Sequence, residues 1–83
     1  MAYKIRYKKS VAKDLKSIEK KEKERILNKI ENTLSKKPNQ YPLLKGRFAG
    51  LRKLRIGNYR VIFSLLDDEI WILRIGHRSE IYK

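Results

Sequence analysis

The sequence predicts a single α+β domain in which a strand and two helices precede a three-stranded antiparallel meander. Apolar residues alternate with period two in residues 2–7, recur at helical spacing across residues 11–34, and return to period two from Leu51 to Ile75. With 83 residues, of which 41% are hydrophobic, the chain has room for one modest core. We therefore expect residues 1–83 to form one domain, with a helical hairpin on one face of the sheet.

The N-terminal segment has the pattern of a half-buried strand. Within residues 2–7, Tyr3, Ile5 and Tyr7 alternate with Lys4 and Arg6. One face of this strand is therefore expected to pack on the core.

Two amphipathic helices are expected next. Ser10 is a plausible N-cap for the first helix, whose apolar stripe is Val11, Leu15 and Ile18. The second helix should end before Pro38, because proline disfavours helical backbone in the residue before it. Its apolar side carries Ile26, Leu27, Ile30, Thr33 and Leu34.

Residues 38–50 are expected to form a loop. They contain both prolines and two of the four glycines of the chain. Tyr41, Leu43 and Leu44 could pin this loop to the core.

Turn residues set the expected register of the last three strands. A two-residue turn at Gly57-Asn58 places Arg55 opposite Arg60. For the next turn we favour a three-residue connection over residues 67–69. It places Trp71, Leu73 and Ile75 on the apolar face, whereas a two-residue turn would place Arg74 there.

This register gathers positive charge on the opposite face of the sheet. The residues expected there are Lys53, Arg55, Arg60, Arg74 and Arg78. No carboxylate occurs between Glu31 and Asp67, so nothing local neutralises Lys53, Arg55 and Arg60, and the register places no acid among the five cations. Like charges placed opposite each other are unfavourable, which favours an anion-binding site. A solvent face rich in lysine and arginine that merely prevents aggregation is the alternative.

The overall charge also indicates a polyanionic partner. The chain has 22 Lys and Arg against 9 Asp and Glu, a net charge of +13. Without cysteine, disulfides and thiolate metal sites are excluded and the cytoplasm is the expected location. The longest apolar run, residues 70–73, is too short to span a bilayer, so no membrane association is expected.

The chemistry left open by composition is metal-free phosphodiester cleavage. One histidine and scattered carboxylates do not suggest a metal site, no glycine-rich nucleotide loop is present, and we expect no cofactor. An RNA 2′-hydroxyl can attack its own phosphate when a protein moves protons and stabilises charge. His77, Arg78, Glu80 and Tyr82 lie close together near the C-terminus, although a lone histidine is more often structural. A tyrosine could act as a base only if nearby cations lowered its pKa.

Two motifs resemble the RelE/ParE toxin superfamily. They are GxxxGLRKLRIGNYRVIF at residues 46–63 and GHRxEIY at residues 76–82, and the AKDL of residues 12–15 also fits. The resemblance spans nearly the whole chain and implies a RelE-like fold. It also implies the toxin of a type II toxin-antitoxin pair, with RelE-type members acting as ribosome-dependent endoribonucleases on messenger RNA.

The resemblance also implies residue roles. Lys53 and Arg55 would form a cation pair, Arg60 would bind the scissile phosphate, Arg78 would bind phosphate or protonate the leaving oxygen, and Tyr82 would be the base. Further substrate-binding candidates are Lys45, Arg47, Arg52, Arg74 and His77.

The resemblance further implies partners and alternatives. The expected partners are messenger RNA on the ribosome and an acidic antitoxin, with a toxin-antitoxin heterotetramer as one assembly. ParE-type relatives instead poison DNA gyrase, and a noncatalytic module that binds nucleic acid is a third reading.

Overall fold

The α+β architecture expected from the sequence is confirmed. The computed structural model describes residues 3–79 and 81, and for Arg47 it describes only the backbone. The main elements are β1 (Lys4–Tyr7), α1 (Lys9–Lys16), α2 (Lys20–Lys29), β2 (Arg52–Ile56), β3 (Tyr59–Leu66) and β4 (Glu69–His77). A π-helical turn, Ile30–Leu34, continues α2 and ends before Pro38, as expected.

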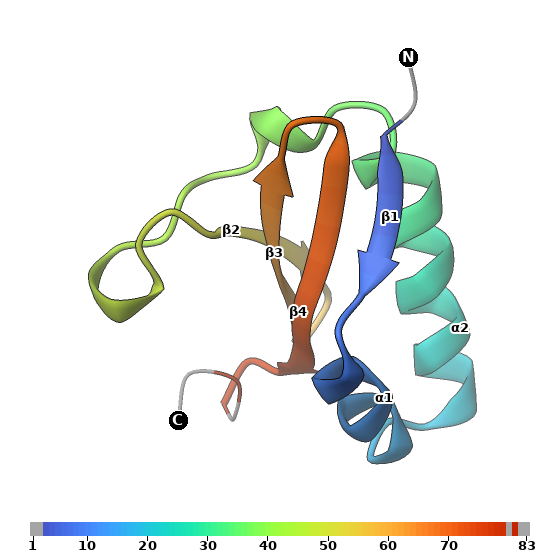
Figure 1. Ribbon diagram of the computed structural model, residues 1–83. Coiled ribbons are helices and arrows are strands. Elements are labelled where there is room, and N and C mark those ends of the chain that lie inside the picture. The colour runs from blue at the N-terminus through green and yellow to red at the C-terminus, as the bar shows by residue number, and fades with distance from the viewer. Residues whose placement is uncertain (1–2, 80, 82–83) are drawn as a thin grey trace.

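The four strands form one sheet in the order β1-β4-β3-β2 (Figure 1). The meander of β2, β3 and β4 is antiparallel, and β1 pairs in parallel with the first half of β4. The last strand in sequence therefore lies inside the sheet, between β1 and β3.

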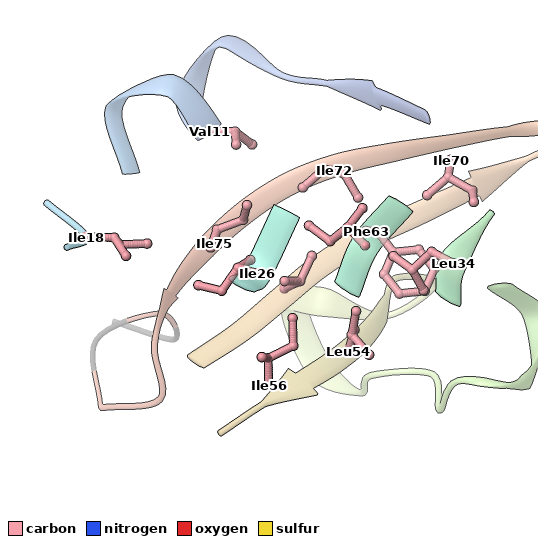
Figure 2. Close-up of a cluster of buried hydrophobic side chains, with 12 residues drawn as sticks. Val11, Ile18, Ile26, Leu34, Leu54, Ile56, Phe63, Ile70, Ile72 and Ile75 are labelled. Atoms are coloured by element: carbon pink, nitrogen blue, oxygen red, sulfur yellow. The ribbon is translucent and has the colours of Figure 1, made fainter. Parts of the chain in front are cut away.

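The core lies between the helices and one face of the sheet. Ile26, Ile30 and Leu34 recur every four residues through α2 and the π-helical turn, and each is 0% exposed. They meet side chains from the strands in one cluster (Figure 2). None of the helices in residues 3–79 has both the length and the hydropathy needed to cross a membrane.

Ser10 does not cap the first helix as expected. The helix begins at Lys9, and the Ser10 hydroxyl donates to the backbone oxygen of Leu73 at 2.8 Å. Because β1 ends opposite Ile72, the edge of β4 beyond that point has no strand beside it. The hydroxyl therefore satisfies a strand carbonyl rather than a helix N–H.

The β2–β3 register is confirmed, whereas the expected β3–β4 turn is wrong. Arg55 pairs with Arg60 across the Gly57-Asn58 turn. At the other end of β3, Leu66 pairs with Glu69, so the turn has two residues rather than three. Asp67 adopts φ 54°, a left-handed conformation that such tight hairpin turns require.

A β-bulge in β4 corrects the effect of this shorter turn. Phe63 pairs with Ile72 and Ile62 with Arg74, which leaves Leu73 as the extra residue. Ile70 and Ile72 thus face the core, and the expectation that Trp71 and Leu73 do so is wrong. Beyond the bulge Ile75 faces the core, and Arg74 is on the opposite face as expected.

The loop of residues 38–50 is fastened mainly by Tyr41. It contains two short 3₁₀ turns, Pro38–Gln40 and Gly46–Phe48. The Tyr41 ring packs edge-on against Phe63, with centroids 6.2 Å apart. Leu43 is 56% exposed, so it does not anchor the loop as proposed.

Candidate functional site

The sheet face opposite the core, here called the outer face, carries a cluster of positive charge. Two rows of paired residues run across it, Lys53–Ile62–Arg74 and Arg55–Arg60–Gly76. Neighbouring strands lie about 5 Å apart and successive rows on one face about 7 Å apart. The two rows therefore bring cations of β2, β3 and β4 onto one face. We call Lys53 and Arg55 of β2 and Arg60 of β3 the cation cluster.

Arg60 is the central member of this cluster, and its guanidinium is incompletely bonded. Its Nη1 atom is buried and has no hydrogen-bond partner among the described residues. A buried charged donor without a partner costs a few kcal/mol, which an anion would recover. Arg55 lies directly opposite and adds like charge. The pair therefore combines an unbonded guanidinium donor with a second positive charge on the neighbouring strand.

Ile81, which follows β4 in the sequence, packs beside the register partner of Arg60. Gly76, the register partner of Arg60, lies under Ile81: a Cβ placed on this glycine would be 3.6 Å from the Ile81 Cβ. The Ile81 N–H donates to the His77 carbonyl at 3.0 Å, and its side chain is 2% exposed. This apolar contact places Ile81 beside Gly76, the register partner of Arg60.

Arg74 shares this face but is already paired with Asp14 of α1. Its Nε and Nη2 atoms donate to the two carboxylate oxygens of Asp14, at 2.9 and 3.2 Å. The hydrogen bonds to Asp14 raise the pKa of Arg74. The expectation that no acid lies among the five cations is therefore wrong, because Asp14 pairs with Arg74.

Asp14 was missed as a residue that shapes the site. It also accepts the backbone N–H of Ile75 at 3.0 Å. Asp14 and Ser10 are four residues apart on α1, and both bond the backbone of the bulged segment. Asp14 and Arg74 are 60 positions apart in the sequence, so local sequence patterns do not reveal this contact.

Three further candidates lie in the loop before β2 or at the start of that strand. Arg52 has the core-facing parity of β2, and its Nη1 donates to the carbonyl oxygens of Asn39 and Tyr41, at 3.2 and 2.7 Å. Lys45 is exposed in the loop and precedes the 3₁₀ turn that contains Arg47. The structure thus gives Arg52 a loop-fastening contact rather than a place in the cluster.

His77 lies on the core-facing parity, as the sequence indicated. It pairs with Tyr59, and the two rings meet edge-on with centroids 5.7 Å apart. The Ser79 N–H donates to His77 Nδ1 at 3.2 Å, which makes Nδ1 an acceptor and places the proton of the neutral ring on Nε2. The imidazole therefore does not face the cation cluster.

Two C-terminal candidates lie at or beyond the end of β4. The Arg78 N–H donates to the Asn58 carbonyl at 2.8 Å, and its side chain is exposed. This bond places Arg78 beside the β2–β3 turn. Tyr82, together with Glu80, lies outside the described residues. Among residues 3–79 and 81, no group of three or more His, Asp or Glu side chains could hold a metal ion.

Comparison with known proteins identifies one family of toxins. The family model described as the ParE toxin of the type II toxin-antitoxin system parDE matches residues 5–82. Among curated proteins, none matches the sequence.

Several solved structures share the fold. The toxin-antitoxin complex RelBE2 from Mycobacterium tuberculosis contains a chain with a TM-score of 0.87 and 25% identity, over 94% of this chain and 100% of that one. The RelB-RelE antitoxin-toxin complex from Methanococcus jannaschii contains a chain with a TM-score of 0.67 and 26% identity, over 93% of this chain and 94% of that one. A chromosomal ParDE system from P. aeruginosa contains a chain with a TM-score of 0.75 and 21% identity, over 92% of this chain and 96% of that one. At this identity the similarity is one of fold alone.

Proposed function

Because the chain belongs to the family of ParE toxins of type II toxin-antitoxin systems, we propose that it is a toxin that cleaves messenger RNA on the ribosome. The proposed activity is that of a metal-independent endoribonuclease. RelE-type structures are among the matches, and the cation cluster suits a phosphodiester substrate.

The buried, unpartnered Nη1 of Arg60 carries this proposal. A guanidinium can hold two oxygens of one phosphate through parallel hydrogen bonds. Lys53 and Arg55 flank Arg60 on the same face and add charge that attracts the developing phosphorane. A surface whose cations served only solubility would leave such donors in water.

The proposed reaction is transesterification within the RNA. The 2′-oxygen forms a bond to phosphorus while the bond from phosphorus to the 5′-oxygen of the next nucleotide breaks. The proton of the 2′-hydroxyl goes to a base, and a second proton reaches the leaving oxygen. The products are a 2′,3′-cyclic phosphate and a 5′-hydroxyl. We assign the base to Tyr82 and the leaving-group contact to Arg78, which follow Ile81 and β4 along the chain.

The proposed regulator is an acidic antitoxin. A groove of about 470 Å³ between α1 and α2 is lined by the apolar side chains of Val11, Leu15 and Leu27, and also by two lysines, Lys8 and Lys9, and one acidic residue, Glu31. An amphipathic helix with acidic flanks would match the apolar floor and the two lysines. RelE chains in the matched complexes are bound to RelB antitoxins.

A second candidate function is inhibition of DNA gyrase. The matched family model is that of ParE toxins, which favours this alternative. It predicts DNA damage without RNA cuts and no special dependence on Arg60. A noncatalytic module that binds nucleic acid would instead depend on all cations alike.

The decisive experiment maps transcript 5′ ends after induction, with and without translation. The proposal predicts new ends bearing a 5′-hydroxyl that appear only during translation. Arg60→Ala should reduce cleavage by about 10²- to 10³-fold, the usual effect of removing one group that stabilises the transition state. Lys20→Ala, a change at an exposed cation of α2, is the matched control and should cleave normally.

Three results would reject the assignment. They are full cleavage by folded Arg60→Ala, equal loss in the Lys20→Ala control, and DNA damage with intact transcripts. The last of these would select the gyrase reading.

A further inference from the structure

The only tryptophan of the chain lies on the outer face of the sheet. Trp71 pairs with Arg6 of β1 on one side and Ser64 of β3 on the other. Its neighbours Ile70 and Ile72 are buried in the core, whereas Trp71 is partly exposed. The bulge separates it along β4 from the row that contains Arg60. A large aromatic surface is thus retained outside the core, on the same face as the cation cluster.

Polar contacts hold the Trp71 ring in place. Its Nε1 donates to Glu69 Oε1 at 3.2 Å, and Arg6 Nε donates to Glu69 Oε2 at 2.9 Å. The Arg6 guanidinium carbon lies 6.0 Å from the ring centroid. The hydrogen bond from Arg6 lowers the pKa of Glu69, so this carboxylate is ionised and compensated at neutral pH. The ring is therefore oriented before any ligand arrives.

This arrangement is typical of surfaces that bind single-stranded nucleic acid. Such surfaces combine cations that contact the backbone with aromatic rings on which bases stack, and stacking tolerates any base. Ser64, the partner of Trp71, is four residues from Arg60 along β3, a separation of about 13 Å. A short run of nucleotides spans this distance. One strand could thus place a phosphate at Arg60 and a base on Trp71.

We propose that Trp71 is a stacking platform for an unpaired nucleobase of the RNA whose phosphate Arg60 binds. Arg6 orients the ring through Glu69 and supplies positive charge beside the base. The identity of the polymer rests on the proposed function, whereas the platform can be tested without any cleavage. The platform extends the binding surface from the cation cluster across β4 to β1.

Trp71 itself reports on the proposed contact, because all tryptophan fluorescence of the chain comes from it. The probe is a short 2′-O-methyl oligoadenylate, which cannot be cleaved because its 2′-oxygen carries no proton. An abasic oligonucleotide of the same length and charge is its control. The expected result is strong quenching by the oligoadenylate and little by the abasic chain.

Variants separate stacking from charge. Because the Trp71 variants contain no tryptophan, binding is followed by the fluorescence anisotropy of dye-labelled probes. Trp71→Leu should weaken oligoadenylate binding about tenfold, as expected for the loss of one stacked base, and leave abasic binding unchanged. Trp71→Phe should recover most of the affinity, which guards against a simple folding defect. Arg60→Ala should weaken both probes, whereas Arg25→Gln, a change at an exposed cation of α2, should affect neither.

The inference is overturned if both probes quench equally, if Trp71→Leu binds as tightly as the parent, or if the oligoadenylate does not bind at all. If quenching depends on the base but Arg60→Ala still cleaves RNA, the stacking role of Trp71 is supported and the nuclease assignment is rejected. If Arg60→Ala loses cleavage but quenching does not depend on the base, the nuclease assignment is supported and the stacking role is rejected.

Discussion

Replacing Asp14 by alanine should destabilise the fold through the bulge in β4. In the native protein the Asp14 carboxylate accepts the N–H of Ile75 at 3.0 Å and two N–H groups of Arg74 at 2.9 and 3.2 Å. Alanine removes both acceptor oxygens and with them all three hydrogen bonds. The Ile75 N–H then lies at a strand edge without its partner.

The expected loss of unfolding free energy in Asp14→Ala follows from the kinds of bond that are lost and from their exposure to water. A hydrogen bond from a backbone N–H to a charged acceptor contributes about 1.5–3 kcal/mol. The ion pair adds only about 0.5 kcal/mol, because the Arg74 side chain is 45% exposed and water screens it. We therefore expect Asp14→Ala to lower the free energy of unfolding by about 2–3 kcal/mol, a large share of the typical 5–15 kcal/mol.

Urea denaturation of two further variants tests the origin of this loss. Asp14→Asn keeps an oxygen that can accept the Ile75 N–H and should cost about 1 kcal/mol. Arg74→Gln removes the ion pair but keeps the Ile75 bond, and should cost no more than about 1 kcal/mol. The reasoning fails if Asp14→Ala lies within about 0.5 kcal/mol of the parent. It also fails if Arg74→Gln is as damaging as Asp14→Ala.

Two further predictions concern residues outside the cation cluster. Burial, with a smaller contribution from the Glu31 carboxylate, raises the pKa of Tyr7 from 10.0 to about 12. The stabilisation by the protonated phenol is therefore complete below pH 10 and lost as pH rises towards 12. At neutral pH, Tyr7→Phe should be less stable than the parent by about 1 kcal/mol, a figure discounted because the Tyr7 side chain is partly exposed. The difference in stability should vanish as the pH rises from 10 to about 12. Denaturation curves that show a constant difference over this range would contradict the prediction. Arg52→Ala should cost about 2 kcal/mol by releasing the carbonyl oxygens of Asn39 and Tyr41. Cleavage per folded molecule should stay unchanged, and a selective loss of cleavage would instead place Arg52 in the substrate site.

The sequence predicted the β2–β3 hairpin because its signals are local. Gly57-Asn58 supplies residues that a two-residue turn needs, and Gly57 has φ 58°. Alternation on either side then fixes which side chains share a face. The pairing of Arg55 with Arg60 followed directly.

The β3–β4 hairpin shows where such reasoning fails. The sequence 67–69 consists of three acidic residues and does not reveal a turn of two residues. The bulge at Leu73 has no composition signal either, since Trp71, Leu73 and Ile75 are all apolar. The wrong turn and the unseen bulge each shift the register by one residue, so their effects cancelled at Arg74. They did not cancel at Trp71, which was assigned to the wrong face.

Long-range polar contacts were the other limit. The Asp14 side chain is only 14% exposed and bonds a strand 60 positions away in the sequence. Likewise, nothing near Ile81 in sequence shows that it packs on Gly76. Local periodicity identifies faces, but it does not identify the partner that covers them.

The strand order has a consequence for synthesis of the protein. β4 is made after the other three strands but occupies an interior place in the sheet, where it pairs with the first strand on one side and the preceding strand on the other. During translation β1 has no partner until residues 69–72 have left the exit tunnel, and the core remains open until then. The outer face is completed in the same step, because Arg74 and Gly76 arrive with β4. A growing chain therefore cannot assemble the whole outer face before β4 has been made.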